Sequence, residues 1–381
     1  MKKTACAALA AMAMAVSVAS AADFPAYLKM DGTTIVGCDQ LELPDNLVIP
    51  DGVTEIAEGA FFECLYLESV VIPGSVKRIA GTYFNDKGAF EGCTSLKSVT
   101  FLDGATAVGG FYNCTALVSV TLPNSVTKID DGAFAFCTSL ASVTLPDSVT
   151  AIGESAFDGC TSLASVTIGN GVTAIGDFAF YGCTSLASIT LLDSVTAIGE
   201  RAFYECTSLT SITLPDSVTE IGEWAFGGCT SLASVTIGNG VTAIGDSAFY
   251  GCTSLASIAL PDSVTAIGDC AFYECTSLAS ITIPKRVANV PDRAFENCTS
   301  LKNVTFTRGV TSISDFAFSL CTSLASVSIP RSVTRIGSSA FNGCNNFTVQ
   351  FDGTKAQWQH ISGAGSITAT IHCTDGDITA R

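Results

Sequence analysis

The sequence predicts a β-rich solenoid of about 13 stacked coils of 23 residues, closed by a cap at each end. Residues 137–159, CTSLASVTLPDSVTAIGESAFDG, recur with few changes along most of the 381-residue chain. The pair Phe-x-x-Cys occurs 13 times, from Phe61/Cys64 to Phe341/Cys344, and successive cysteines are 23 residues apart from Cys114 onward. A fixed period of this length is typical of stacked coils rather than of a globule around one centre.

The first half of each coil is predicted to be a short strand followed by a turn. Val143 and Leu145 alternate with small polar residues, which is the pattern of a strand with one buried face. Pro146 and Asp147 then predict a turn, because proline restricts φ and aspartate bonds the neighbouring backbone. The strands of successive coils are expected to pair in parallel, about 4.8 Å apart.

The second half of the coil is predicted to contain another short extended piece and a single helical turn. Residues 149–152 are extended, and the glycine that follows them ends this piece. Residues 154–157 are expected to form the helical turn, which buries Phe157 and Cys160. An isolated coil buries too few side chains to offset the entropy of ordering its backbone, so each coil depends on its neighbours.

The repeat resembles the BspA-type leucine-rich repeat of bacterial secreted and cell-surface proteins. The pattern LxxVxLPxSVTxIGxxAFxxCTSL carries the resemblance, from about residue 52 to residue 344. The resemblance implies a leucine-rich repeat solenoid and a role in surface adhesion or host-protein binding. It brings no catalytic residues.

The N-terminal segment has the three parts of a signal peptide. Met1, Lys2 and Lys3 precede an apolar run at residues 7–18, and small residues follow. Residues 1–22 are therefore expected to be removed by cleavage near Ala21/Ala22. This places the mature chain outside the cell or on its surface, without a transmembrane segment.

The remaining chain is predicted to divide into three parts. Residues 23–51 form an N-terminal cap with a hairpin turn at Asp31-Gly32, and residues 52–344 form the repeats. Residues 345–381 form a C-terminal cap with a terminal strand, a short helix around Trp358 and a final extended segment. The ending GTxxxW…HCTDG resembles those that follow such repeats in other exported bacterial proteins.

One coil is longer than the others. The spacing from Cys64 to Cys93 is 29 residues, and the excess falls near residues 82–87. Insertions in solenoids become loops on one face. This loop is either a binding element or a neutral connection.

The charge of the chain is negative and unevenly distributed. The formal net charge is −17, and removal of the two leader lysines gives −17 − 2 = −19. Such a chain is a poor candidate for binding nucleic acid, which requires a basic face. Residues 130–284 hold 16 acids and one base (1 − 16 = −15), whereas residues 285–344 hold seven bases and three acids (7 − 3 = +4). The basic end of the rod can bind the acidic middle of another copy or an anionic surface. Sequence variation without function at exposed turn positions also explains the uneven charge.

Most of the 17 cysteines occupy one position of the repeat. Stacked coils would hold their Cβ vectors parallel, a geometry that resists disulfides, so a ladder of buried free thiols is expected. The pattern predicts no metal site, because the ladder lacks a zinc-ligand cluster. Cys38, Cys270 and Cys373 lie off the ladder and are the candidates for reactive or paired thiols.

An acidic residue recurs seventeen positions after the ladder cysteine in nine successive coils. As the first residue of a helical turn it would accept backbone N–H bonds. Stacked like charges repel each other, however, so recruitment of divalent cations or of a basic partner is the alternative. This acidic row consists of Asp131, Glu154, Asp177, Glu200, Glu223, Asp246, Asp269, Asp292 and Asp315.

Aromatic residues recur beside the buried phenylalanine. Tyrosine and tryptophan are the residue types that anchor interfaces, so this aromatic row is the candidate ligand-binding surface; covering the coil edge is the other interpretation. Its members are Tyr181, Tyr204, Trp224, Tyr250 and Tyr273.

The function predicted from these features is non-catalytic binding. The only histidines, His360 and His372, lie outside the repeats, and no catalytic residue or cofactor is predicted. The chain is expected to be an adhesin-like surface protein that binds host or bacterial proteins or glycans. The alternative is a self-associating structural component of the cell surface or matrix.

Overall fold

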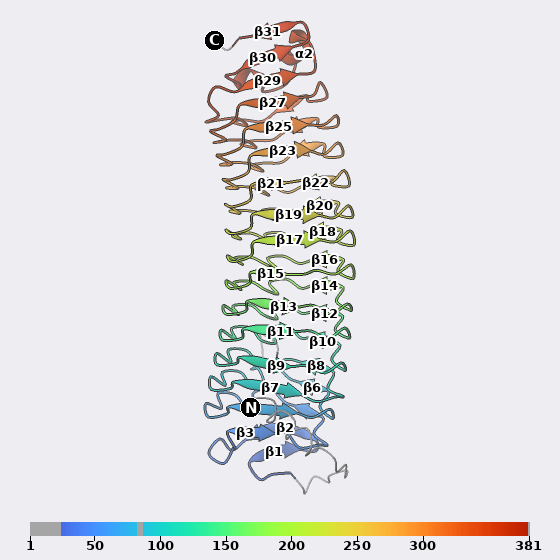
Figure 1. Cartoon of the computed structure of the whole chain (residues 1–381), viewed down its shortest axis with the longest axis vertical. Coiled ribbons are helices and arrows are strands. Elements are labelled where there is room, and N and C mark those ends of the chain that lie inside the picture. The colour runs from blue at the N-terminus through green and yellow to red at the C-terminus, as the bar shows by residue number, and fades with distance from the viewer. Residues whose placement is uncertain (1–23, 82–86, 380–381) are drawn as a thin grey trace, which may run out of the picture.

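The computed structural model of the protein describes residues 24–81 and 87–379. These residues form an elongated stack of coils between an N-terminal hairpin and a C-terminal cap (Figure 1). The predicted leucine-rich repeat solenoid is confirmed, with about 15 turns rather than about 13. The predicted signal peptide (1–22) and residues 82–86 of the predicted insertion lie outside the described residues.

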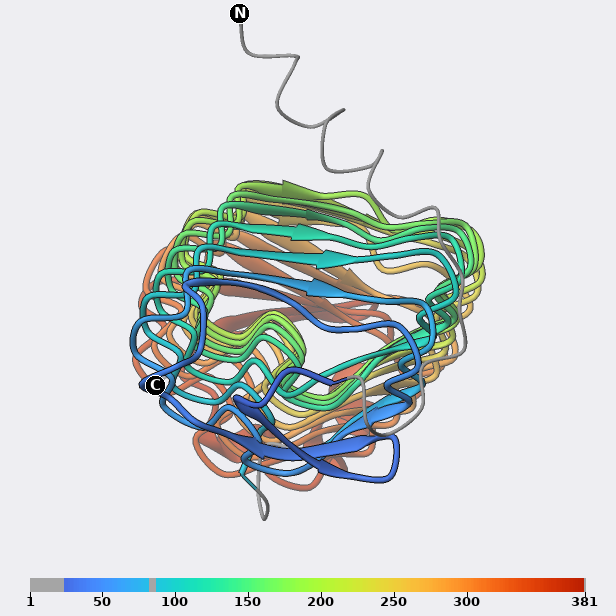
Figure 2. The same cartoon turned by 90° about the horizontal axis from the view of Figure 1, so that it is seen from below.

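Each coil contributes one strand of two to four residues, called its longer strand, to a parallel ladder that consists of four sheets among the described residues. Equivalent residues 23 positions apart face each other, as Val143 and Val166 do, and the longer strands form one flat side of the stack (Figure 2). The alternating side chains of these strands point into the core and into solvent. These strands are β3 Asn46–Val48, β5 Ser69–Ile72, β7 Ser98–Phe101, β9 Ser119–Thr121, β11 Ser142–Thr144, β13 Ser165–Thr167, β15 Ser188–Ile189, β17 Ser211–Leu214, β19 Ser234–Ile237, β21 Ser257–Ile258, β23 Ser280–Ile283, β25 Asn303–Phe306, β27 Ser326–Ile329 and β29 Thr348–Phe351.

A second parallel ladder consists of two-residue strands, one after the turn of each coil. Ile152 faces Ile175 in the next coil, and both are buried. These strands are β4 Glu55–Ile56, β6 Arg78–Ile79, β8 Ala107–Val108, β10 Lys128–Ile129, β12 Ala151–Ile152, β14 Ala174–Ile175, β16 Ala197–Ile198, β18 Glu220–Ile221, β20 Ala243–Ile244, β22 Ala266–Ile267, β24 Asn289–Val290, β26 Ser312–Ile313 and β28 Arg335–Ile336.

The third part of the coil differs from the prediction, because tight turns replace the expected helical turn. Ser155 and Gly159 have φ values of 53° and 65°, in the left-handed region that interrupts a right-handed helix. The turn backbone bonds to the next coil instead: the Phe157 N–H donates to the Ala179 carbonyl at 2.8 Å. Neighbouring coils thus satisfy the amides that a helix would satisfy internally.

The core contains a continuous stack of phenylalanines. Twelve of them, from Phe61 to Phe318, are fully buried. Successive rings from Phe61 to Phe341 lie 4.8–5.7 Å apart between centroids and are nearly parallel. This spacing follows the distance between paired strands.

A ladder of free, buried thiols runs beside the phenylalanines, as predicted. From Cys93 to Cys344 each thiol donates to the phenylalanine carbonyl of the preceding coil, at 3.1–3.3 Å. Burial raises the pKa of Cys229 to about 12, so this thiol stays protonated and able to donate. Cys38 extends the row, with its Sγ 3.4 Å from that of Cys64, while Cys270 and Cys373 are half-buried elsewhere.

At both ends of the solenoid, further strands pair with the last strands of the ladders and cover their edges. The predicted N-terminal hairpin is present as β1 Leu28–Asp31 and β2 Thr34–Cys38, and β2 pairs with β4. At the other end β29 pairs in parallel with β30 Thr370–Cys373, and β31 Gly376–Ile378 adds an antiparallel strand. The predicted helix around the buried Trp358 is α2 Lys355–Gln359, which the 3-10 turn η2 Ala364–Ser366 follows.

Candidate functional site: the turn edge

The tight turns bring three columns of side chains to one edge of the solenoid. In the coil of residues 153–159 they are Ser155, Asp158 and Gly159, and the same positions recur every 23 residues. We call these three columns the turn edge. The aromatic row lies on it, and the acidic row lies directly beside its first column.

The five residues of the aromatic row form one continuous contact line. The ring centroids of Tyr181 and Tyr204 are 5.1 Å apart, and those of Tyr250 and Tyr273 are 4.9 Å apart. Trp224 joins the two pairs, at 5.8 Å from Tyr204 and 4.9 Å from Tyr250. All five side chains are half-buried, so the line is a fixed surface.

Trp224 takes this place because its coil has a glycine where the neighbouring coils have tyrosine. A Cβ at Gly227 would lie 2.9 Å from the Tyr204 ring and 3.0 Å from the Trp224 ring, tighter than normal side-chain contacts. The missing side chain leaves room for the indole from the adjacent column. The sequence predicted the row, and the structure supplies this reason for its continuity.

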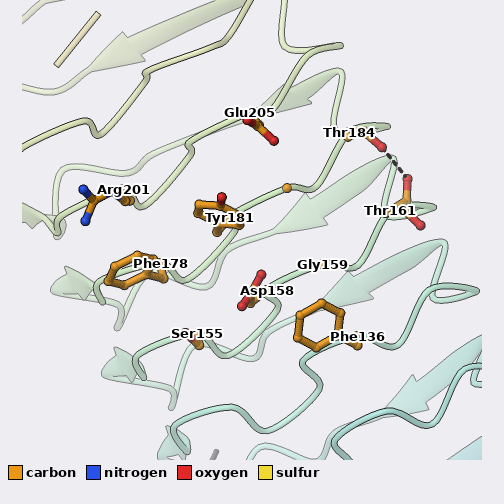
Figure 3. A pocket seen from close by; sticks show the side chains of 11 residues that line it. Phe136, Ser155, Asp158, Gly159, Thr161, Phe178, Tyr181, Thr184, Arg201 and Glu205 are labelled. Atoms are coloured by element: carbon orange, nitrogen blue, oxygen red, sulfur yellow. Dashed lines mark hydrogen bonds between the residues drawn. The ribbon is translucent and has the colours of Figure 1, made fainter. Parts of the chain in front are cut away.

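A hollow of about 630 Å³ opens on the turn edge next to the row. It exists because one coil carries small or short residues at all three columns, with Ser155, Asp158 and Gly159 as its floor. Phe136 of the preceding coil and Phe178 and Tyr181 of the following coil form its walls (Figure 3).

The hollow combines aromatic walls with charged groups. The side chain of Asp158 is on the floor, and this residue is only 7% exposed. Arg201 and Glu205 lie at the rim, and the Arg201 guanidinium lies over the Phe178 ring at 5.5 Å while pairing with Glu200. Burial, followed by the charge of Glu205, raises the pKa of Tyr181, which keeps its hydroxyl protonated as a hydrogen-bond donor.

The acidic row serves the backbone between coils. Each of its six aspartates accepts, through Oδ1, the backbone N–H of the residue 23 positions later. The bonds are 2.7–3.0 Å long, and the accepting residues are Asp131, Asp177, Asp246, Asp269, Asp292 and Asp315. The three glutamates of the row make no such bond within the described chain. The aspartates thus accept backbone N–H groups as the capping role predicts, but these groups belong to the next coil rather than to a helix.

Glycine stands beside four of these six bonds, and proline or serine stands beside the other two. A Cβ at Gly199 would lie 2.4 Å from Oδ1 of Asp177, a distance that no side chain tolerates. At these four bonds the close approach of the aspartate to the backbone of the next coil favours glycine.

The like charges of the row repel each other. Partial burial raises the pKa of Glu154, and the charges of Asp131, Asp177 and Glu200 raise it further. In residues 24–81 and 87–379 no group of three or more His, Cys, Asp or Glu side chains is arranged to hold a metal ion. His372 lies 2.9 Å from Asp377 and His360 contacts the Ala356 carbonyl, both in the C-terminal segment away from the turn edge.

The floor and rim of the hollow were missed by the sequence analysis. Ser155 and Asp158 stand at positions where the following coil carries an aromatic residue, and Arg201 stands where both neighbouring coils do. An alignment of the coils shows that the aromatic residues are replaced at these positions. That the replacement creates a hollow is visible only in the structure, where the turns place the three columns side by side.

The family of the protein follows from the repeats. The family model described as BspA type leucine rich repeat region (6 copies) matches residues 37–88, 86–173, 109–233 and 225–348. The chain belongs to this family. The matched residues include the aromatic row, the acidic row and the hollow, so the candidate site lies on the BspA-type repeats themselves.

Solved structures of similar proteins share the architecture. A leucine-rich repeat protein from Bacteroides ovatus is 26% identical, with a TM-score of 0.70, and the match covers 91% of this chain and 96% of that one. A leucine rich cell surface protein from Faecalibacterium prausnitzii is 34% identical, with a TM-score of 0.50 and coverage of 90% and 99%. No curated protein matches the sequence significantly.

The BspA-type fold offers a repeat-built surface suited to protein interaction. None of the helices among the described residues has the length and apolar character needed to cross a membrane.

Proposed function

We propose that the protein is an exported, non-catalytic surface protein that binds a protein or a glycan on its turn edge. The observation that carries this proposal is the continuous aromatic row beside a hollow with a carboxylate on its floor. Stacked rings offer apolar faces at little entropic cost, because their neighbours already hold them in place.

The chemistry of the hollow suits a ligand with both an apolar face and polar groups. Its aromatic walls can stack on a sugar ring or an apolar side chain, Asp158 accepts hydrogen bonds, and Arg201 donates them. Host or bacterial proteins and glycans present such combinations. An adhesin-like role follows if the ligand lies on another cell.

Export is the second part of the proposal. The basic start and apolar run of residues 1–22 support it, as does the similarity to a relative described as a cell surface protein. The mature protein is expected to begin near Ala22 or Asp23, which mass spectrometry of the secreted chain measures.

The binding test uses arrays of immobilised glycans and cell-surface proteins. Wild-type protein is expected to bind at least one component, and Tyr181→Ala/Tyr204→Ala is expected to weaken that binding at least about tenfold. Asp158→Asn tests the hollow separately. Tyr66→Ala is the matched control, because Tyr66 is 75% exposed and lies outside the row.

Equal binding by the wild type and the double variant would show that the ligand does not use the aromatic row. Circular dichroism of each variant establishes that the solenoid is intact, so a loss of binding is attributed to the removed rings.

A further inference from the structure

A different turn of the coil carries a column of charges that changes sign along the rod. The column lies five residues after the start of each longer strand. Strand pairing keeps its members in register from Asp216 to Asp262 and from Lys285 to Arg331, and between these groups the Ala279 N–H donates to the Ala256 carbonyl, again 23 residues apart. Its members from Asp216 to Arg331 are exposed. We call it the turn column, and in its last six repeats it reads Asp216, Asn239, Asp262, Lys285, Arg308 and Arg331.

A second column follows the same change of sign. It lies four residues further along each coil, at the first position of the short strands, which pair in register from Glu220 to Ala266 and from Asn289 to Arg335. Glu220 begins this stretch and Arg335 ends it, with uncharged residues between them. The coil of Asp216 thus carries two acids, and the coil of Arg331 carries two bases.

Three of the four bases in this stretch of the two columns are available to a partner. Lys285 pairs with Asp262 at 2.7 Å, which shows that acid and base of adjacent coils attract each other in this column. Within residues 24–81 and 87–379 no ion pair engages Arg308, Arg331 or Arg335.

We propose that two copies of the chain associate antiparallel through these columns. With a two-fold axis between the coils of Asp262 and Lys285, each base faces an acid or an amide of the second copy. Arg331 then faces Asp216, Arg335 faces Glu220, Lys285 faces Asp262 and Arg308 faces Asn239. The interface is isologous, so every pair forms twice.

The spacing of the charges selects a second copy as the partner. The coils repeat every 5.2–5.4 Å in this region, measured between stacked phenylalanine rings, and a second copy has the same repeat. Both columns therefore match over six coils without adjustment. A parallel arrangement is excluded, because it would set Arg331 against Arg331.

The attraction between the facing charges and the repulsion between the two acidic chains depend differently on salt concentration. The Debye length is about 10 Å at 0.1 M salt and about 3 Å at 1 M. Moderate salt screens the distant acids and leaves the facing pairs, whereas high salt weakens both. A weak, reversible dimer is expected near 0.1 M salt.

Sedimentation of the full chain tests the proposal. At about 0.1 M salt the wild type is expected to sediment at twice the mass of the chain, and at 1 M as the monomer. Arg331→Glu/Arg335→Glu and Asp216→Lys/Glu220→Lys are each expected to lose the dimer, with at least about a tenfold increase in its dissociation constant. An equimolar mixture of these two variants restores both sets of pairs and is expected to restore the dimer.

Lys97→Glu/Lys302→Glu is the control for Arg331→Glu/Arg335→Glu, since it makes the same change in net charge outside the columns and is expected to leave the dimer unchanged. A wild type that stays monomeric at every salt concentration would overturn the proposal, even if it bound an anionic polymer. So would a mixture of two folded variants that stays monomeric. The aromatic row is not in the interface, so failure here leaves the proposed function untouched.

Discussion

At the scale of single residues, the fold rests on positions that serve two neighbours at once. Phe203 stacks on Phe180 at 5.4 Å and on Phe226 at 5.3 Å. Its carbonyl also accepts the thiol of Cys229 at 3.1 Å. One side chain therefore joins three coils, and its loss is felt on both sides.

Phe203→Ala is expected to lower the free energy of unfolding by about 3–5 kcal/mol, because it leaves a cavity in a close-packed stack. Urea denaturation measures this loss. The control Tyr66→Ala removes an exposed ring and is expected to change stability by less than about 0.5 kcal/mol. Similar values for the two variants would show that the phenylalanine stack is not the core of the solenoid.

Substitutions of Asp177 distinguish the capping role of the acidic row from cation binding. Its Oδ1 accepts the Glu200 N–H at 2.7 Å. Asp177→Asn keeps the acceptor and is expected to be nearly neutral, whereas Asp177→Ala leaves the N–H unbonded and is expected to cost about 1 kcal/mol. Both are measured by thermal unfolding with and without calcium. Stabilisation of the wild type by calcium, lost in Asp177→Asn, would favour the cation role instead.

At the scale of the coil, the sequence predicts the strands well and the tight turns poorly. Val143 and Leu145 report a buried strand face through their alternation alone. By contrast, Phe178, Arg201 and Trp224 adopt positive φ, which their residue types do not favour. Hydrogen bonds to the next coil hold these residues in place, and such bonds are not visible in a local pattern.

The acidic row lowers the stability of the folded protein by an amount that depends on pH. The pKa of Glu154 is raised in the folded protein, so the folded state holds the proton more tightly than the unfolded chain. Stability therefore falls as the pH rises from about 4.3, the ordinary glutamate value, through the folded pKa, and is constant above it.

Glu154→Gln removes this loss and is expected to raise the free energy of unfolding at pH 7 by up to about 1 kcal/mol, as other exposed charge contacts do. The difference from the wild type is expected to vanish near pH 4. Thermal unfolding across this range checks the sign. A variant that is less stable at pH 7 would mean that Glu154 has a favourable contact.

At the scale of the whole molecule, the period determines most of the fold but not its ends or its site. The 13 Phe-x-x-Cys pairs lie between the 14 longer strands from β3 to β29, and β30 extends the ladder without a further pair, which explains the count of 13 coils. The aromatic row was predictable because tyrosines recur with the period. The hollow was not, because it arises where Asp158 and its neighbours depart from the period.

The central claim is that each coil is stabilised by neighbours in register. It predicts that deleting one full period, residues 252–274, brings Cys275 into the place of Cys252 and leaves a shorter, intact solenoid. Deleting only residues 252–263 leaves an 11-residue segment that is too short to complete a coil.

Urea unfolding of these two deletion variants, followed by circular dichroism, tests the claim most directly. The 23-residue deletion is expected to unfold in one cooperative transition near the wild-type midpoint, and the 12-residue deletion at a much lower urea concentration. Equal destabilisation by the two deletions would contradict the account.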